Sequence, residues 1–90
     1  MHAKGFFIVL NDRGLHTRPS TELVRLTSKF KSDVSLRLRR TEVNGKSLLG
    51  ILMLAATKGS KIWVETKGDD APVALEALLS LAKEKFNSPY

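Results

Sequence analysis

The sequence predicts an α+β fold, an open-faced sandwich in which three helices cover one face of a four-stranded antiparallel sheet. Segments rich in β-forming residues alternate along the chain with segments in which apolar residues recur at helical spacing. A short polar turn joins the two middle β segments, which makes them a hairpin. The resulting order is β-α-β-β-α-β-α, and 90 residues are enough for one such domain, residues 1–90.

Each predicted strand is short and is bounded by turn residues. The segment Gly5–Leu10 is a run of β-forming residues that ends at the polar turn Asn11–Gly14. The segment Asp33–Arg39 alternates apolar with polar side chains, which is the period-two pattern of a half-buried strand. Thr41–Val43 returns beside it as the second strand of the hairpin, and Lys61–Lys67 is the last predicted strand.

Three helices are predicted, over about Thr17–Phe30, Ser47–Thr57 and Ala71–Phe86. Pro19 and Pro72 lie in the first turns of the first and last helices, where a fixed φ and a missing N–H are tolerated. A glycine after the middle helix suits the left-handed position that often follows a helix C-terminus. The last residues, 87–90, are expected to fray.

The composition excludes several classes of protein. No apolar run approaches the roughly 20 residues of a membrane span, and Phe6–Leu10 is too short for the core of a signal peptide. The chain has no cysteine, which excludes disulfides and thiol chemistry and fits the cytoplasm, the location that we expect. Two histidines without any cysteine also argue against a zinc site.

The net charge of +6 favours acidic partners or nucleic acid, although charge also serves solubility. A small basic nucleic-acid-binding module is therefore an alternative function, with Arg37, Arg39 and Arg40 clustered at the hairpin. Against it, aromatic residues make up only 7% of the chain, and no aromatic RNA-binding motif is present. Arginines at a hairpin also protect a sheet edge from pairing with other chains.

The segment Gly14–Ser20, Gly-Leu-His-Thr-Arg-Pro-Ser, places a histidine at the start of a helix. His16 lies beside the free N–H groups and the positive dipole end of that helix, and Arg18 follows shortly after. Free amides and a guanidinium form an anion site, so an imidazole here is placed to receive a phosphoryl group. A neutral imidazole nitrogen is the nucleophile in such a transfer. No paired carboxylates and no Ser-His-Asp set accompany it, which argues against a catalytic enzyme.

Two motifs resemble those of one known family. The Gly14–Ser20 segment resembles the histidine phosphorylation site of HPr, the histidine-containing phosphocarrier of the bacterial sugar phosphotransferase system. The segment Asn44–Gly50, Asn-Gly-Lys-Ser-Leu-Leu-Gly, resembles the serine phosphorylation site of the same family. The spacing of the motifs and the chain length also fit one HPr domain, so the resemblance covers nearly the whole chain and implies the same open-faced sandwich.

The resemblance implies a stoichiometric phosphoryl carrier rather than an enzyme. His16 would accept the phosphoryl group from phospho-Enzyme I, itself charged from phosphoenolpyruvate, and would pass it to a histidine of a sugar-specific IIA protein. Arg18 would stabilise the bound phosphoryl group, and neither a metal nor a cofactor is implied. The chain could serve sugar uptake or be a regulatory paralogue, and its residues do not separate these two functions.

Ser47 has two interpretations. Serine is favoured at a helix N-cap, so capping alone accounts for its position. The resemblance adds a regulatory function, phosphorylation by an HPr kinase/phosphorylase. The negative charge of a phosphoserine would repel an acidic docking surface on the partner and so slow the phosphorylation of His16.

The helix after Ser47 carries more apolar side chains than a single buried face accommodates. We therefore expect part of this excess to be exposed, the alternative being a helix buried on all sides. By resemblance, partner proteins dock on a surface formed by Thr17, Thr21, Arg25, Leu48, Leu49, Gly50 and Leu52. An apolar centre with a basic rim suits a transient interface.

The uncovered face of the sheet is also expected to be apolar. If Phe7 and Val9 point toward the helices, the alternate residues of the same strand point away from them. The outward-facing set is then Phe6, Ile8, Leu10 and, from the last strand, Trp63. Such a patch commonly marks an interface, so we expect self-association or a further partner on this face. A shift in register, or a tail folded over the face, would remove the patch.

Overall fold

The computed structural model describes residues 1–90 and contains the predicted order of elements, followed by a short 3-10 turn. The elements are β1 (His2–Ile8), α1 (Thr17–Thr27), β2 (Asp33–Leu38), β3 (Thr41–Asn44), α2 (Leu48–Met53), β4 (Lys61–Lys67), α3 (Ala71–Lys83) and η1 (Lys85–Asn87). None of the helices has both the length and the apolar character needed to span a bilayer.

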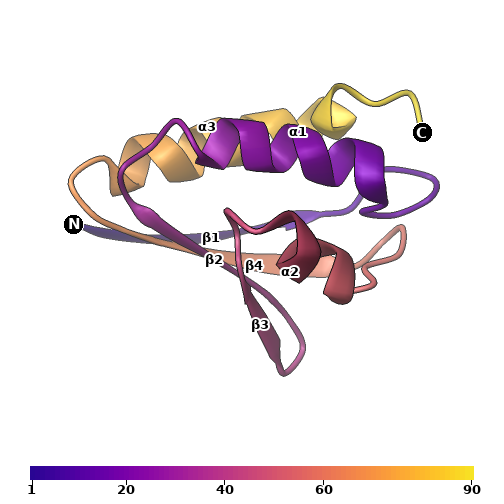
Figure 1. Ribbon diagram of the computed structural model, residues 1–90, viewed down its shortest axis with the longest axis horizontal. Helices are drawn as coiled ribbons and strands as arrows, with labels where there is room; N and C mark the ends of the chain where they lie inside the picture. The colour runs from indigo at the N-terminus through magenta and orange to yellow at the C-terminus, as the bar shows by residue number, and fades with distance from the viewer.

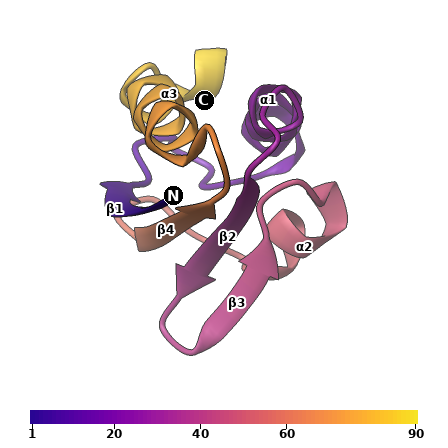
Figure 2. The same cartoon turned by 90° about the vertical axis from the view of Figure 1, so that its left-hand side faces the viewer.

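The strands form one antiparallel sheet with the order β1-β4-β2-β3, so the last strand of the chain lies between the first two. In the β1–β4 pair, His2 lies opposite Lys67 and Ile8 lies opposite Lys61. All three helices lie on the same face of this sheet (Figures 1 and 2). Helix α3 packs on β1 and β4, and α2 lies next to α1 and β3. The predicted open-faced sandwich is confirmed.

The core lies between the sheet and the helices. Side chains that alternate along the strands point toward the helices and are at most 6% exposed, namely Phe7, Val9, Val34, Leu36, Ile62 and Val64. The helices contribute Leu23, Ile51 and Leu78, which are at most 1% exposed. Burying one large apolar side chain stabilises a fold by about 1.5–3 kcal/mol, so this two-layer packing fixes the helices on the sheet.

Helix α2 is shorter than the predicted Ser47–Thr57. Ala55 adopts a φ of +51°, which ends the helix, and Ala56 is buried. The main-chain carbonyl of Ala56 accepts a hydrogen bond of 2.9 Å from the N–H of Leu15. The predicted helix end was wrong because this contact with a distant segment outweighs the local helix propensity.

The first strand and the first helix also differ from their predicted bounds. Strand β1 begins at His2 rather than Gly5, because its pairing with β4 extends to Lys67. Helix α1 ends at Thr27, short of the predicted end, and the Thr27 hydroxyl donates a hydrogen bond of 2.8 Å to the carbonyl of Gly45. The bounds of the two hairpin strands agree with the prediction to within a residue, which is the precision of such boundaries.

The last helix ends at Lys83, earlier than predicted, and a left-handed turn follows it. Residues 85–87 all have positive φ, between 53° and 56°. This turn reverses the chain and buries Phe86 completely, with its ring centroid 5.4 Å from that of Phe7. Ser88 is also buried, at 4% exposed. The expectation that residues 87–90 fray was therefore wrong at Ser88.

The turn of the β2–β3 hairpin is tight. Leu38 lies opposite Thr41, which leaves Arg39 and Arg40 as the turn residues. Arg39 adopts a φ of +55°, a conformation that a β-carbon disfavours, and its carbonyl accepts a hydrogen bond of 2.7 Å from the guanidinium of Arg37. Because Arg40 does not have a positive φ, this is not a type I′ turn.

Asp70 ties the start of α3 to the loop between α1 and β2. Its carboxylate accepts hydrogen bonds of 2.9 Å from the main-chain N–H groups of Lys31 and Ser32, and another from the Ser32 hydroxyl. The Ser32 hydroxyl contributes most to lowering the pKa of Asp70 from 3.8 to about 2, and the Lys31 amide adds to the effect. A carboxylate whose pKa is lower in the folded than in the unfolded state stabilises the fold above its unfolded pKa.

We therefore predict that Asp70→Asn destabilises the protein at neutral pH. The difference from wild type should be fully present above the unfolded pKa of 3.8 and should shrink as the pH falls toward about 2, where the native carboxyl becomes protonated. Urea unfolding of both proteins across this pH range measures the difference. Asp69→Asn is the matched control, because Asp69 is exposed and forms no side-chain hydrogen bond. An unchanged stability of Asp70→Asn at neutral pH would contradict the prediction.

Candidate functional site

A tight turn that ends at Gly14 delivers the chain to the start of α1. Gly14 adopts a φ of +69°, and a β-carbon there would lie 2.1 Å from the carbonyl oxygen of Ala56. Only glycine fits both the conformation and the space. Leu15 then donates its N–H to the same carbonyl at 2.9 Å. The next residue, His16, is thereby fixed relative to the segment that follows α2.

His16 occupies the N-cap position of α1, with φ −75° and ψ −172°. Its carbonyl accepts the first helical hydrogen bond, 3.1 Å from the N–H of Ser20, but its side chain caps no amide. The main-chain N–H groups of Thr17 and Arg18 therefore have no partner, and Pro19 has no N–H. The half-buried imidazole stands at a helix N-terminus whose amides are available to an anion.

Arg18 lies in the first turn of α1, two residues after His16. It is exposed and forms no ion pair. With Thr21, Glu22, Arg25 and Asn87 it lines a shallow hollow in which no hydrophobic residue takes part. The guanidinium of Arg25 lies 3.0 Å from the carboxylate of Glu22, so its charge is partly balanced. Arg18 is thus a guanidinium without an ion pair in the first turn of α1.

The C-terminal segment reaches the same site, which the sequence did not indicate. Nε2 of His16 lies 3.2 Å from the main-chain oxygen of Tyr90. The guanidinium carbon of Arg13 lies 5.1 Å from the centroid of the Tyr90 ring. Figure 1 shows the end of the chain above the start of α1. No local pattern around Tyr90 predicts these contacts, because they depend on the left-handed turn at residues 85–87.

Ser47 caps α2 as predicted. Its hydroxyl oxygen accepts a hydrogen bond of 3.0 Å from the N–H of Gly50, and its backbone is extended, with φ −109° and ψ 114°. A β-carbon at Gly50 would lie 3.3 Å from the Ser47 side chain, so the glycine gives the cap its room. Ser47 remains half-buried, which leaves its hydroxyl partly accessible.

The apolar excess of α2 is exposed, as expected. Leu48 is 36% and Leu49 is 69% exposed, whereas Ile51 alone turns fully into the core. Met53, which is not among the predicted docking residues, is 70% exposed and extends this surface. We call Leu48, Leu49, Leu52 and Met53 the α2 apolar surface. Of the remaining predicted docking residues, Gly50 lies on α2. The others, Thr17, Thr21 and Arg25, lie on α1.

The predicted apolar residues of the uncovered sheet face are exposed. We call Phe6, Ile8, Leu10 and Trp63 the open-face patch, whose members are 39–46% exposed. Phe6 lies opposite Trp63 in the β1–β4 pair, with ring centroids 5.5 Å apart. The ammonium of Lys61 lies over both rings, at 4.2 Å and 4.4 Å from their centroids. The buried Phe7 and Val9 confirm the expected register, and the C-terminal segment contacts His16 rather than this face.

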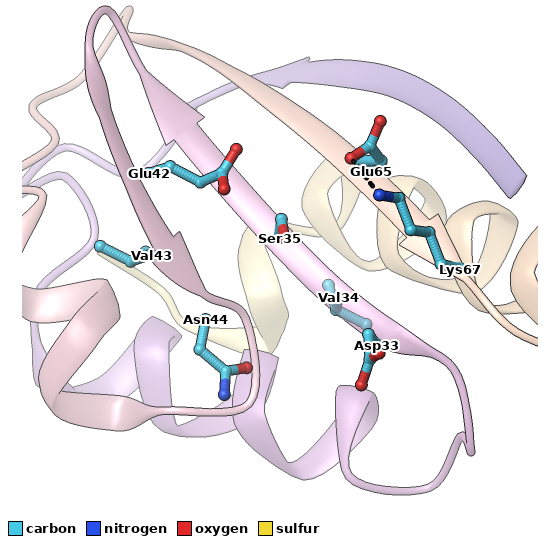
Figure 3. Close-up of a pocket in the computed structure, with 8 residues that line it drawn as sticks. All are labelled: Asp33, Val34, Ser35, Glu42, Val43, Asn44, Glu65 and Lys67. Carbon is cyan, nitrogen blue, oxygen red and sulfur yellow. Dashed lines mark ion pairs between the residues drawn. The ribbon is translucent and has the colours of Figure 1, made fainter.

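A second hollow opens on the sheet between β2, β3 and β4 (Figure 3). Its carboxylates are Asp33, Glu42 and Glu65, and Glu65 lies 3.7 Å from the ammonium of Lys67. A hydrogen bond from His2 contributes most to lowering the pKa of Glu65, so this carboxylate stays charged. The carboxylates would repel a phosphoryl group, and no group of acidic or histidine side chains in the structure is arranged to hold a metal ion.

Comparison with known proteins identifies the family. The family model described as the PTS HPr component phosphorylation site, where PTS is the phosphotransferase system, matches residues 4–84. The chain belongs to the HPr family of phosphocarriers. The phosphocarrier protein HPr of Xylella fastidiosa is 42% identical over 80 residues, which cover 89% of this chain and 90% of that protein. The matched region includes the segments of His16 and Ser47.

Solved structures agree with this assignment. The crystal structure of HPr-C-His from Thermoanaerobacter tengcongensis has a TM-score of 0.92 at 32% identity, covering 98% of this chain and 99% of that chain. The HPr dimer from the same organism has a TM-score of 0.77 at 34% identity, covering 91% and 94%. The open-faced sandwich of this chain is therefore the fold of solved HPr structures.

Proposed function

We propose that this chain is a stoichiometric carrier that accepts a phosphoryl group on His16 from phospho-Enzyme I and passes it to a histidine of sugar-specific IIA proteins. The position of His16 at the N-cap of α1 carries this proposal. The unpartnered amides of Thr17 and Arg18 and the free Arg18 guanidinium would bind the phosphoryl oxygens. We place this activity in the cytoplasm and in one functional unit of residues 1–90.

The transfer step needs neither a metal nor a cofactor. The lone pair of a neutral ring nitrogen of His16 attacks phosphorus and forms a P–N bond. The P–N bond to the donor histidine breaks, and its electron pair returns to the donor ring. The helix amides and Arg18 balance the charge of the transferred group. Because the bond formed and the bond broken are of the same kind, the transfer is reversible and little of the free energy of the phosphoryl group is lost when it moves to His16.

An intact-mass assay tests the proposal. The protein is mixed with Enzyme I and phosphoenolpyruvate, and wild type should acquire an acid-labile phosphoryl adduct that His16→Ala lacks. His2→Ala is the matched control, because the other histidine lies on the open face, 2.6 Å from Glu65, and should not affect the adduct. The same adduct on His16→Ala, or none on wild type, would refute the proposal.

The α2 apolar surface and the exposed residues of α1 are proposed to dock the partner proteins. The α2 side chains supply an apolar centre, with Leu49 and Met53 about 70% exposed. Arg18 and Arg25 supply a basic rim on the neighbouring helix, and α1 packs against α2. Ser47 caps α2 at the edge of this centre, so a phosphate there would add negative charge within the docking surface. Regulation by an HPr kinase/phosphorylase would act in this way.

We predict that Leu49→Ser and Ser47→Asp each raise the KM of Enzyme I for this protein by roughly tenfold. This rise is equivalent to a loss of about 1.4 kcal/mol of binding free energy. The first change removes apolar contact area. The second introduces a single negative charge, smaller than that of a phosphoserine, while retaining a side chain that caps the helix. Steady-state phosphoryl transfer measures both effects.

The chain offers a matched control for each variant. Val73→Ser removes an apolar side chain that is 60% exposed on α3, outside the docking surface, and should leave KM unchanged. Ser47→Asn keeps a capping side chain without a charge and should also behave as wild type. If Leu49→Ser matches Val73→Ser, the α2 apolar surface is not the docking site. If Ser47→Asp matches Ser47→Asn, charge at this position does not regulate docking.

A second proposal is that the open-face patch mediates self-association through a second copy of the chain. Phe6 and Trp63 form an exposed aromatic pair on adjacent strands, and the patch lies on the face without helices, away from the α1 N-terminus. The related HPr dimer of T. tengcongensis shows that association of copies occurs in the family. Exposed aromatic clusters of this kind are common centres of protein interfaces.

Sedimentation at micromolar concentration tests this second proposal. Wild type should form a dimer that Trp63→Ser dissociates, whereas the control Val73→Ser should leave it intact. A wild-type protein that sediments as a monomer would contradict it.

The acceptor of the phosphoryl group distinguishes a sugar-transport carrier from a regulatory paralogue. Transfer to a sugar-specific IIA protein is the function that we propose. No specific observation favours the nucleic-acid-binding module, because the family assignment accounts for the His16 segment and that module does not.

A further inference from the structure

We infer that Tyr90 is a positioning residue for His16: its main-chain oxygen holds the imidazole in one tautomer, and Arg13 holds Tyr90 in place. This inference rests on the proposed function, because it concerns the same phosphoryl acceptor. Tyr90 lies outside residues 4–84, the region that the family model matches. The family match therefore assigns Tyr90 no function.

The C-terminal segment is anchored before it reaches His16. Phe86 is fully buried, and the left-handed turn around it redirects the chain after α3. The side-chain amide of Asn11, itself fully buried, donates a hydrogen bond of 2.9 Å to the carbonyl of Lys85. Ser88 is buried and donates its N–H to the same carbonyl at 3.0 Å. These contacts anchor the chain up to Ser88, so only Pro89 lies between the anchored segment and Tyr90.

The contact with Tyr90 selects one tautomer of His16. A main-chain oxygen can only accept a hydrogen bond, so Nε2 of His16 must be the donor. In a neutral imidazole the other nitrogen, Nδ1, then carries the lone pair. Nδ1 forms no hydrogen bond in the structure, so that lone pair is free to act as the nucleophile.

The same contact supports the transfer step. When Nδ1 attacks phosphorus, a P–N bond forms and the donor's P–N bond breaks, with its electron pair returning to the donor ring. The Nε2 proton stays on His16 throughout. Positive charge develops on the ring as the new bond forms, and the Tyr90 oxygen, which accepts the Nε2 hydrogen bond, stabilises that charge.

Arg13 links Tyr90 to the turn that fixes His16. Its guanidinium lies 5.1 Å from the centroid of the Tyr90 ring, a cation–π contact between two exposed side chains. Arg13 immediately precedes Gly14, whose close approach to Ala56 fixes the turn. The turn therefore holds both the imidazole and the residue that orients it.

The test combines nitrogen NMR of the His16 ring with phosphoryl transfer. Three variants loosen the contact: deletion of Pro89 and Tyr90, Tyr90→Ala, and Arg13→Ala. Each should raise the population of the Nδ1–H tautomer and lower the rate of phosphoryl acceptance from Enzyme I by about threefold to tenfold, the effect of one lost hydrogen bond. Tyr90→Phe keeps the aromatic ring and should have the tautomer population and transfer rate of wild type. Arg40→Ala, at the β2–β3 turn, is the matched control for loss of a surface arginine.

The NMR measurement needs no Enzyme I, so it separates this inference from the proposed function. Unchanged tautomer populations and rates in all three variants, with the folded spectrum retained, would overturn the inference while leaving His16 as the acceptor. If only the deletion variant changed, the Tyr90 oxygen would remain part of the inference, whereas the contribution of Arg13 would be refuted. Altered tautomers in a protein that Enzyme I never phosphorylates would support the positioning contact and refute the proposed function.

Discussion

The close approach of Gly14 to the carbonyl of Ala56 is the constraint on which the functional surface depends. Because no β-carbon fits between them, this position must be a glycine, and its φ of +69° turns the chain. Leu15 then donates a hydrogen bond to the same carbonyl. This contact sets where α1 begins, and it also requires α2 to end before Ala56. The N-terminus of α1 and the exposed side of α2 are therefore fixed relative to each other by one backbone carbonyl.

The N-termini of α1 and α2 differ in whether a side chain caps their free amides. At α2, the hydroxyl of Ser47 satisfies the N–H of Gly50, so the helix end is closed. At α1, the side chain of His16 caps nothing, and the amides of Thr17 and Arg18 stay unpartnered. An uncapped helix end is slightly less stable, but it can bind an anion. The N-cap residue of α3, Asp70, also caps no amide of its helix with its side chain, so it is the open helix end together with the imidazole of His16 that suits the proposed phosphoryl site.

Most of the fold could be predicted from the sequence, because the alternation in β2 and the helical spacing in α1 and α3 are local patterns. The end of α2 could not, since a hydrogen bond between Ala56 and Leu15 determines it and these residues lie far apart in the chain. In the proposed site, His16, Arg18 and Ser47 could be named from their motifs. The contact between Tyr90 and His16 could not be predicted, because it depends on a left-handed turn at residues 85–87 that contains no glycine.

The central claim is that His16 carries a phosphoryl group that can leave again, and reversal of the transfer tests it most directly. The phosphorylated protein is isolated, freed of phosphoenolpyruvate and mixed with unphosphorylated Enzyme I and pyruvate. Because the transfer exchanges one P–N bond for another, the adduct should disappear rapidly and phosphoenolpyruvate should form, only when Enzyme I is present. An adduct that persists on the protein under these conditions would contradict the claim, since it would mark an end-point modification rather than a carrier.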